Sequence, residues 1–225
     1  MINKKIKAIA ELIEEPGVID IGTDHGYLIR ELARLNKLSR AIAADINTLP
    51  LDSAKKNLKN IPNIDFIKSD GLQSIDLDIL KDYKAIVIAG MGGSVIKSIL
   101  ESSNEKISNQ TLYLQPSGSI FILRNYLYEM NYQIYQEKII FDNDQYYEII
   151  VCRKSESKVN YTNNEIMFGP INLNEKSELF INYLKNSKEY YQVLLKSIPR
   201  SNNNYAKFTD KINKIDEILK DEKWN

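Results

Sequence analysis

The chain has 225 residues, of which 43% are hydrophobic and 27% are charged, which is typical of a globular protein with one main domain and a smaller one. Lysine plus arginine and aspartate plus glutamate both number 30, so any surface that binds nucleic acid must be local. The sequence lacks a run of about 18 apolar residues and a signal peptide, and its single cysteine, Cys152, excludes an internal disulfide, so we expect a cytoplasmic protein without a membrane span.

The first expected element is an amphipathic helix over residues 2–14, in which Ile6, Ile9, Ala10 and Ile13 share one face. Short β-branched runs then alternate with helical patterns. Strands are expected at 18–21, 41–46, 65–70, 84–90 and 111–116, and helices at 27–35, 50–58, from 94, and at 119–130. This alternation predicts a parallel sheet with helices on both faces. Two further runs, 132–141 and 145–154, flank turn residues and predict an antiparallel hairpin.

The C-terminal part of the sequence has a different pattern. Residues 154–174 lack clear periodicity and are interpreted as a linker or docking strap, so we expect a domain of residues 1–155 followed by one of 156–225. Helical spacing returns from Phe180 to Ile198 and from Tyr205 to Leu219, on either side of Pro199 and an asparagine run. The two helices are expected to form an antiparallel coiled hairpin.

Most of the glycines follow expected strands. Seven of the nine do so, namely Gly22, Gly26, Gly71, Gly90, Gly92, Gly93 and Gly118. In open α/β sheets ligands bind outside the carboxyl ends of the strands, where the backbone approaches the ligand closely. The glycines therefore predict a binding site at this edge.

The turn after the first strand carries acids among its glycines. Asp20 to Gly26 reads D-x-G-x-D-x-G, a variant of the D-x-G-x-G-x-G turn of Rossmann-like methyltransferases. A carboxylate at Asp24 would repel the pyrophosphate of a dinucleotide. S-adenosylmethionine has no phosphate and carries a sulfonium and an ammonium group, which Asp20 and Asp24 would attract. The expected cofactor is therefore S-adenosylmethionine, with Gly22, His25 and Gly26 in the same turn.

Two more acids end the next two strands. Asp45, with Ile46 beside it, lies where an acid accepts hydrogen bonds from ribose hydroxyls. Asp70, before Gly71, lies where methyltransferases commonly bind the adenine amino group. Each acid alone is equally consistent with a helix cap, but together they favour a cofactor site.

The fourth strand ends in Ala89-Gly90-Met91-Gly92-Gly93, which offers mainly backbone groups. An acceptor with an in-ring nitrogen fits such a site, because its lone pair needs positioning rather than deprotonation. Met91 is interpreted either as a substrate contact or as a core residue beneath the cofactor, and Tyr27 either as a stacking residue or as core. His25 is expected to position the loop or pack against the cofactor rather than act as a base.

Five motifs resemble the bacterial tRNA (adenine-22) N1-methyltransferase family, TrmK. They are DIGTDHGYL (20–28), AGMGG (89–93), LQPS (114–117), YEIIV (147–151) and FGP (168–170) followed by Glu175-Lys176. The resemblance implies a Rossmann-like class I methyltransferase with a mostly parallel seven-stranded sheet and a C-terminal helical coiled-coil hairpin. It also implies transfer of a methyl group from S-adenosylmethionine to N1 of adenine 22 in tRNA. Thr23, Gly26 and Ser117 depart from the family pattern, and Ser117 stands where the family usually has Asn.

The expected site follows from these interpretations. Catalytic or acceptor contacts are expected from Asp24, Tyr27, Met91 and Ser117. The cofactor is expected to contact Asp20, Gly22, Asp24, His25, Gly26, Asp45, Ile46, Asp70, Gly71, Ala89, Gly90 and Met91, without a metal. Lysines and arginines of the hairpin, namely Lys185, Lys188, Lys196, Arg200, Lys207, Lys211 and Lys214, are candidates for tRNA binding by a monomer. Two alternatives stay open: a methyltransferase with another RNA, protein or small-molecule acceptor, and a non-enzymatic module.

Overall fold

The computed structural model describes residues 4–220. By its contacts the chain divides into two compact units at the bond between Gly169 and Pro170. Within the described range, no helix is long and apolar enough to cross a membrane. The same residues contain no group of three or more His, Cys, Asp or Glu side chains that could hold a metal ion.

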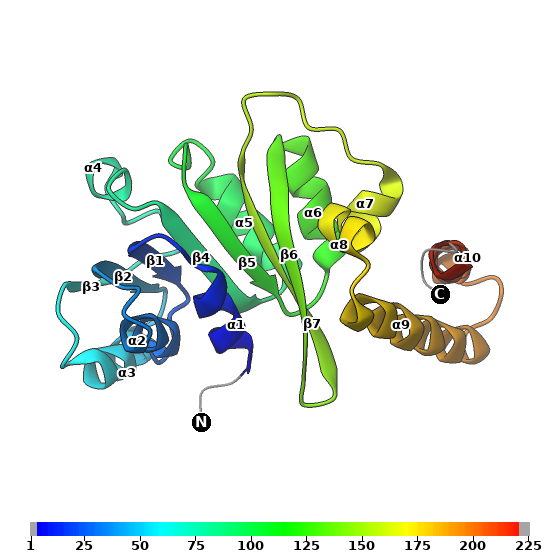
Figure 1. Ribbon diagram of the computed structural model, residues 1–225, viewed down its shortest axis with the longest axis horizontal. Coiled ribbons are helices and arrows are strands. Elements are labelled where there is room, and N and C mark those ends of the chain that lie inside the picture. The colour runs from blue at the N-terminus through cyan, green and yellow to red at the C-terminus, as the bar shows by residue number, and fades with distance from the viewer. Residues whose placement is uncertain (1–3, 221–225) are drawn as a thin grey trace. The chain divides into compact units, whose positions relative to one another are not determined.

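The first unit contains a seven-stranded sheet of order β3-β2-β1-β4-β5-β7-β6 (Figure 1). The first five of these strands run parallel, whereas β7 is antiparallel to both of its neighbours, as the sequence predicted. The chain moves outward from β1 through β2 to β3 and then returns to β4 beside β1, so the topological switch lies between β1 and β4. The strands are β1 (Gly17–Ile21), β2 (Arg40–Asp45), β3 (Ile64–Lys68), β4 (Ala85–Met91), β5 (Thr111–Pro116), β6 (Tyr132–Asp142) and β7 (Gln145–Lys154).

Helices cover both faces of this sheet, with α1 and α2 on one face and α5 and α6 on the other (Figure 1). The helices of the first unit are α1 (Lys4–Leu12), α2 (Tyr27–Arg34), α3 (Thr48–Leu58), α4 (Leu77–Leu80), α5 (Gly93–Ser102), α6 (Ile120–Glu129) and α7 (Asn163–Phe168). The sequence did not predict the short helix α4. Residues 2 and 3 of the expected first helix lie outside the described residues.

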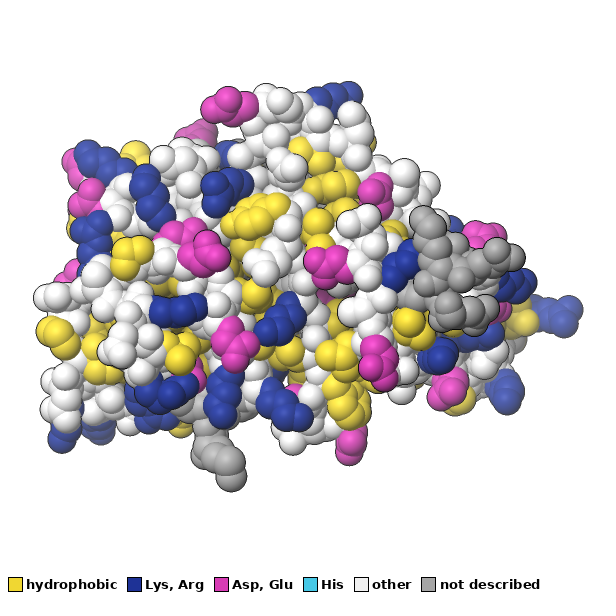
Figure 2. Space-filling model, in the orientation of Figure 1, with side chains coloured by type: hydrophobic (Ala, Val, Ile, Leu, Met, Phe, Trp, Pro, Cys, Tyr) yellow, Lys and Arg dark blue, Asp and Glu magenta, His cyan; other side chains and the backbone are white. Residues whose placement is uncertain are grey.

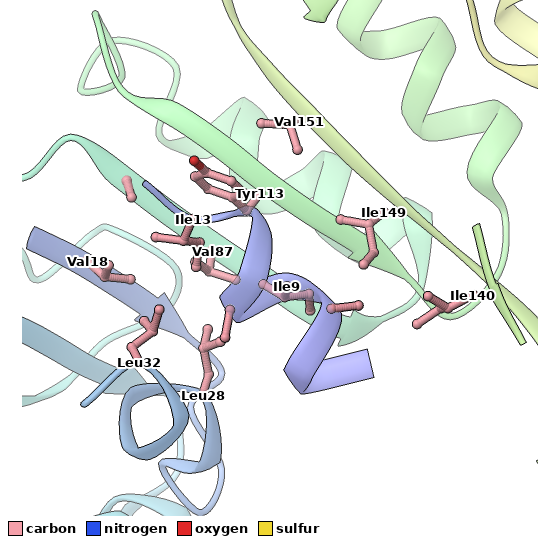
Figure 3. Close-up of a cluster of buried hydrophobic side chains, with 13 residues drawn as sticks. Ile9, Ile13, Val18, Leu28, Leu32, Val87, Tyr113, Ile140, Ile149 and Val151 are labelled. Atoms are coloured by element: carbon pink, nitrogen blue, oxygen red, sulfur yellow. The ribbon is translucent and has the colours of Figure 1, made fainter. Parts of the chain in front are cut away.

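The core beneath α1 and α2 positions the edge of the sheet where the site lies. Ile9 of α1 and Leu28 of α2 point toward the sheet, where they pack with Val87 of β4 and Tyr113 of β5 (Figure 3). These side chains are almost completely buried. Burying an aliphatic side chain of this size stabilises the fold by about 1.5–3 kcal/mol, so α1 is firmly held beside the end of β4.

The segment that the sequence left without structure contains two short helices, α7 and α8 (Pro170–Glu175). α7 begins with a capping box in which the side chains of Thr162 and Glu165 each accept a hydrogen bond from the other's backbone N–H. Before it, the Tyr161 hydroxyl accepts from the N–H of Ile134, and the N–H of Val159 donates to Asn131. The part of this segment up to Gly169 therefore belongs to the first unit, beyond the boundary expected at residue 155.

The second unit consists of α8, α9 (Glu178–Ser197) and α10 (Asn203–Lys220). α9 and α10 pack together through an ion pair of 2.5 Å between Lys188 and Asp216 and through a tilted contact between the rings of Tyr191 and Phe208. These contacts confirm a C-terminal helical hairpin. In Figure 1 α9 lies across the view and α10 is seen along its axis, so the two helices cross.

Candidate cofactor and acceptor site

The turn after β1 folds back against β2. The N–H groups of Gly22 and Thr23 both donate to the carbonyl of Ala44, at 2.8 and 3.1 Å. Three residues of the turn have positive φ: Gly22 (73°), Asp24 (50°) and Gly26 (69°). A methyl group added at Gly22 would collide with the terminal methyl of Met91, so the turn after β1 touches the end of β4. Glycine at residue 22 is therefore favoured chiefly by its positive φ, because the end of the flexible Met91 side chain can move aside.

Asp20 lies at the end of β1 and is buried. Burial raises the pKa of its carboxyl from 3.8 to about 6, the Thr23 hydrogen bond opposes this rise, and the nearby charge of Asp45 adds to it. The Thr23 hydroxyl donates to Asp20 at 2.7 Å. A buried carboxylate with a raised pKa is stabilised by a nearby cation, which suits a cationic ligand at this edge.

A large cavity of about 720 Å³ opens at the carboxyl ends of β1, β2, β3 and β4. Asp24, Asp45 and Asp70 all line it, as do Gly22, Ile46, Gly71, Ala89, Gly90 and Met91. One oxygen of Asp45 accepts from the N–H of Asn47 at 2.8 Å, which fixes that carboxylate at the cavity wall. The acidic residues at successive strand ends are thus brought to a single cavity.

The backbone after β4 is held by β5. Gly90 has a φ of 78°, and its N–H donates to the side-chain carbonyl of Gln115 at 3.2 Å. The side-chain N–H of Gln115 donates to the carbonyl of Pro116 at 2.8 Å. The N–H of Ser117 donates to the carbonyl of Met91 at 2.8 Å. The Ala89–Met91 backbone is therefore fixed by hydrogen bonds from the neighbouring strand.

A smaller cavity of about 150 Å³ lies next to the large one. The two share Gly22, Asp24, Ala89 and Gly90. The other lining residues of the small cavity are Asp20, Thr23, Tyr27, Leu28 and Gln115, together with Lys5, Ile6 and Ile9 of α1. Asp24 therefore stands where a large and a small binding space meet.

Comparison with known proteins identifies the family. Residues 18–217 match the family model described as TrmK, tRNA (adenine(22)-N(1))-methyltransferase. The chain belongs to this family. It is 29% identical over 209 residues to the tRNA (adenine(22)-N(1))-methyltransferase of Bacillus subtilis, a match that covers 89% of this chain and 87% of that protein.

Solved TrmK structures have the same fold. The crystal structure of the B. subtilis m1A22 tRNA methyltransferase TrmK superposes with a TM-score of 0.84 at 26% identity, covering 97% of this chain and 99% of that one. The structure of M. capricolum TrmK in complex with S-adenosyl-homocysteine, the cofactor product, superposes with a TM-score of 0.85 at 32% identity, covering 97% and 98%. The Rossmann-like methyltransferase fold, the cofactor S-adenosylmethionine and the C-terminal helices predicted from the sequence are confirmed.

Three expected site residues of this TrmK chain lie outside the linings of both cavities: His25, Gly26 and Ser117. The Nδ1 atom of His25 is 2.6 Å from the Ser53 hydroxyl, and Asn57 donates to its backbone carbonyl at 3.0 Å. Gly26 packs against Leu58. His25 and Gly26 thus attach the β1 turn to α3, whereas Ser117 contributes its backbone N–H.

Sequence reasoning assigned no site role to Gln115 or to the α1 residues that line the small cavity of this TrmK chain. A signal for Gln115 was present, since it is a polar residue in the otherwise apolar strand TLYLQP and is buried. Lys5 and Ile6 gave no comparable signal. Their place depends on how α1 packs across the sheet, which local periodicity does not determine.

Proposed function

We propose that this chain transfers the methyl group of S-adenosylmethionine to N1 of adenine 22 in tRNA. The observation that carries the proposal is the position of Asp24, at the junction of the large and small cavities and beside the β1–β4 switch point. Family membership supports the reaction and the acceptor.

The large cavity suits the cofactor. Asp45 and Asp70 are acceptors for ribose hydroxyls and an adenine amino group, and the glycines let the backbone approach a ligand. Asp24 at the wall of this cavity, and Asp20 in the adjoining small cavity, attract a ligand that carries positive charge. S-adenosylmethionine supplies an electrophilic methyl group when it is bound.

The small cavity suits the acceptor base. N1 of adenine lies on the pairing edge, so the base must leave its stack before the atom is accessible. Tyr27, at the edge of the small cavity and 37% exposed, offers a ring on which a base can stack. Asp24 can accept a hydrogen bond from the adenine amino group and stabilise the positive charge of the methylated base. Ala89 and Gly90 also line this cavity, and their fixed backbone holds the base in place.

The remaining expectations are proposals of the same kind. We propose that the first domain performs catalysis and that lysines and arginines of the C-terminal hairpin contribute to tRNA binding. We also propose that the protein acts in the cytoplasm as a monomer and without a metal ion. Light scattering of the purified protein, alone and with tRNA, tests the monomer, and activity in the presence of a chelator tests the independence from metal.

The decisive experiment uses methyl-labelled S-adenosylmethionine and unmodified tRNA transcripts that carry adenine or guanine at position 22. The expected product is N1-methyladenosine, found by mass spectrometry only in the adenine transcript. Label on another nucleotide would support RNA methyltransferase activity but show that the target is not adenine 22. If neither transcript is labelled while calorimetry shows cofactor binding, the acceptor proposed here is wrong.

A further inference from the structure

Tyr27, at the edge of the small cavity, carries an arginine on its ring. The central guanidinium carbon of Arg30 lies 5.0 Å from the ring centroid, and the His25 ring lies 5.2 Å from the same ring. Tyr27 begins α2 and Arg30 follows one turn later, so both project from the same side of the helix. The guanidinium is therefore held close to the opening of the acceptor cavity.

Two other arginines of the first unit also stack on tyrosines, and both have acceptors for their N–H groups. Arg40 stacks on Tyr83 and donates to the carbonyl of Asp82. Arg153 stacks on Tyr135 and donates to the hydroxyl of Thr111 at 3.1 Å. The hydrogen bonds and ion pairs of the described residues include none for the Arg30 guanidinium. Its donors are available for an external acceptor.

The acidic neighbour of Arg30 is occupied by another arginine. Glu31 accepts two hydrogen bonds from Arg34, at 2.9 and 2.7 Å. These bonds are the largest cause of the lowered pKa of Glu31, to which the charges of Lys7 and Arg30 contribute weakly. Arg34 thus neutralises Glu31, and the positive charges of Lys7 and Arg30 remain near it.

A further cation, Lys5, lies at the same cavity. Lys5 lines the small cavity, with its Nζ atom 4.3 Å from the ring centroid of Tyr147. Figure 2 shows Lys and Arg side chains gathered on the face where α1 and α2 lie. Lys5 and Arg30 thus place two cations at the acceptor cavity, beside the carboxylates of Asp20 and Asp24 that line it. Cations at this position favour a polyanionic ligand.

We infer that Arg30, held on the ring of Tyr27, binds the phosphate of a nucleotide next to the target adenine. This inference rests on the proposed function, because it takes the acceptor to be RNA. The planar fork of a guanidinium matches two phosphate oxygens, and stacking on a ring restricts its motion before the ligand arrives. The RNA-binding surface then extends from the small cavity over α1 and α2, in addition to the lysines of the C-terminal hairpin.

The test compares Arg30→Met with Arg40→Met. Methionine retains apolar contact with the tyrosine ring and removes the charge. Arg40 is a matched control because it stacks on Tyr83 at the start of β2, the opposite edge of the sheet from the site.

For Arg30→Met we expect the Kd and KM for tRNA to rise about tenfold. We also expect the slope of log K against log salt to lose about one unit. Cofactor affinity should stay unchanged, and Arg40→Met should match the wild type.

The measurements separate this inference from the proposed function. If the wild type methylates adenine 22 and Arg30→Met binds tRNA with the wild-type affinity and salt slope, the inference fails and the function stands. If the wild type binds tRNA without methylating it and Arg30→Met weakens that binding, the proposed methyl transfer fails, whereas the phosphate contact of Arg30 with RNA stands. If the wild type binds no tRNA, both are overturned. Unchanged cofactor affinity by calorimetry shows that each variant is folded.

Discussion

The hydroxyl of Thr23 donates a hydrogen bond of 2.7 Å to the buried carboxylate of Asp20. This bond favours the ionised form, yet the pKa of Asp20 is still raised to about 6, because burial outweighs the bond and Asp45 adds negative charge nearby. In the ligand-free protein the ionised Asp20 therefore destabilises the native state at neutral pH. A cation bound at the site would relieve this cost.

The first prediction concerns pH. The unfolded chain loses the Asp20 proton near pH 3.8, whereas the folded protein retains it to about pH 6. Between these values the folded state binds more protons, so the contribution of Asp20 to stability falls as pH rises. The difference amounts to about 3 kcal/mol. Asp20→Asn should therefore raise the unfolding free energy of the ligand-free protein more at pH 7 than at pH 4, as measured by urea unfolding at both pH values. An equal change in unfolding free energy at both pH values would contradict the role assigned to burial.

The second prediction concerns Asp24. Asn adopts positive φ readily, so Asp24→Asn should keep the turn and remove only the charge. We expect kcat to fall about 100-fold, since the carboxylate stabilises charge on the acceptor, with a smaller effect on cofactor affinity. Asp144→Asn is the control, because Asp144 has a similar φ of 58° at the exposed hairpin turn. Unaltered turnover in Asp24→Asn would remove this residue from the mechanism.

The third prediction concerns Gln115, whose side chain joins Gly90 to β5. Gln115→Leu deletes both of its hydrogen bonds, so the turn after β4 should loosen and kcat/KM for tRNA should fall about tenfold. Gln110→Leu is the control: Gln110 is equally buried, accepts from the N–H of Ser108 at 2.9 Å, and precedes the other end of β5. Both variants should lose about 1–3 kcal/mol of stability, but only Gln115→Leu should lose activity beyond what its unfolded fraction explains.

The fourth prediction concerns stability away from the site. Arg124 is buried and donates at 2.6 Å to both Glu137 and Glu148, which are also buried. Arg124→Met should destabilise the protein by about 3–5 kcal/mol, because it removes the hydrogen-bonded charge of Arg124 from two buried carboxylates. Lys97→Met, which breaks an exposed pair with Glu101, should cost less than about 1 kcal/mol. Thermal unfolding of the two variants measures the difference. Similar midpoints would show that other groups compensate for Arg124.

Much of the fold could be predicted because strand and helix periods are local properties. The expected 111–116 strand has the bounds of β5, and the turn residues between β6 and β7 include Asn143 and Asp144, both with positive φ. The short helices α7 and α8 were not predicted, because six residues are too few to show a period. A signal for α7 was nevertheless present, since Thr162 and Glu165 have the spacing of a capping box.

The candidate site was only partly predictable for a related reason. The acids at strand ends could be placed at one edge, because parallel strands end at the same edge of the sheet. The division into two cavities depends on tertiary packing, since α1 forms one side of the small cavity through Lys5, Ile6 and Ile9. The contact between Gly22 and Met91 likewise joins two turns that are far apart in the sequence.

The wall shared by the two cavities limits how acceptor specificity can change. Because Gly22, Asp24, Ala89 and Gly90 serve both spaces, a substitution that reshapes the acceptor side at these positions also alters the cofactor side. Residues that line only the small cavity, such as Ile6, Ile9 and Tyr27, are free of this constraint. Divergence toward a different acceptor, in nature or by engineering, should therefore accumulate on α1 and at the start of α2 while the glycine turns stay unchanged.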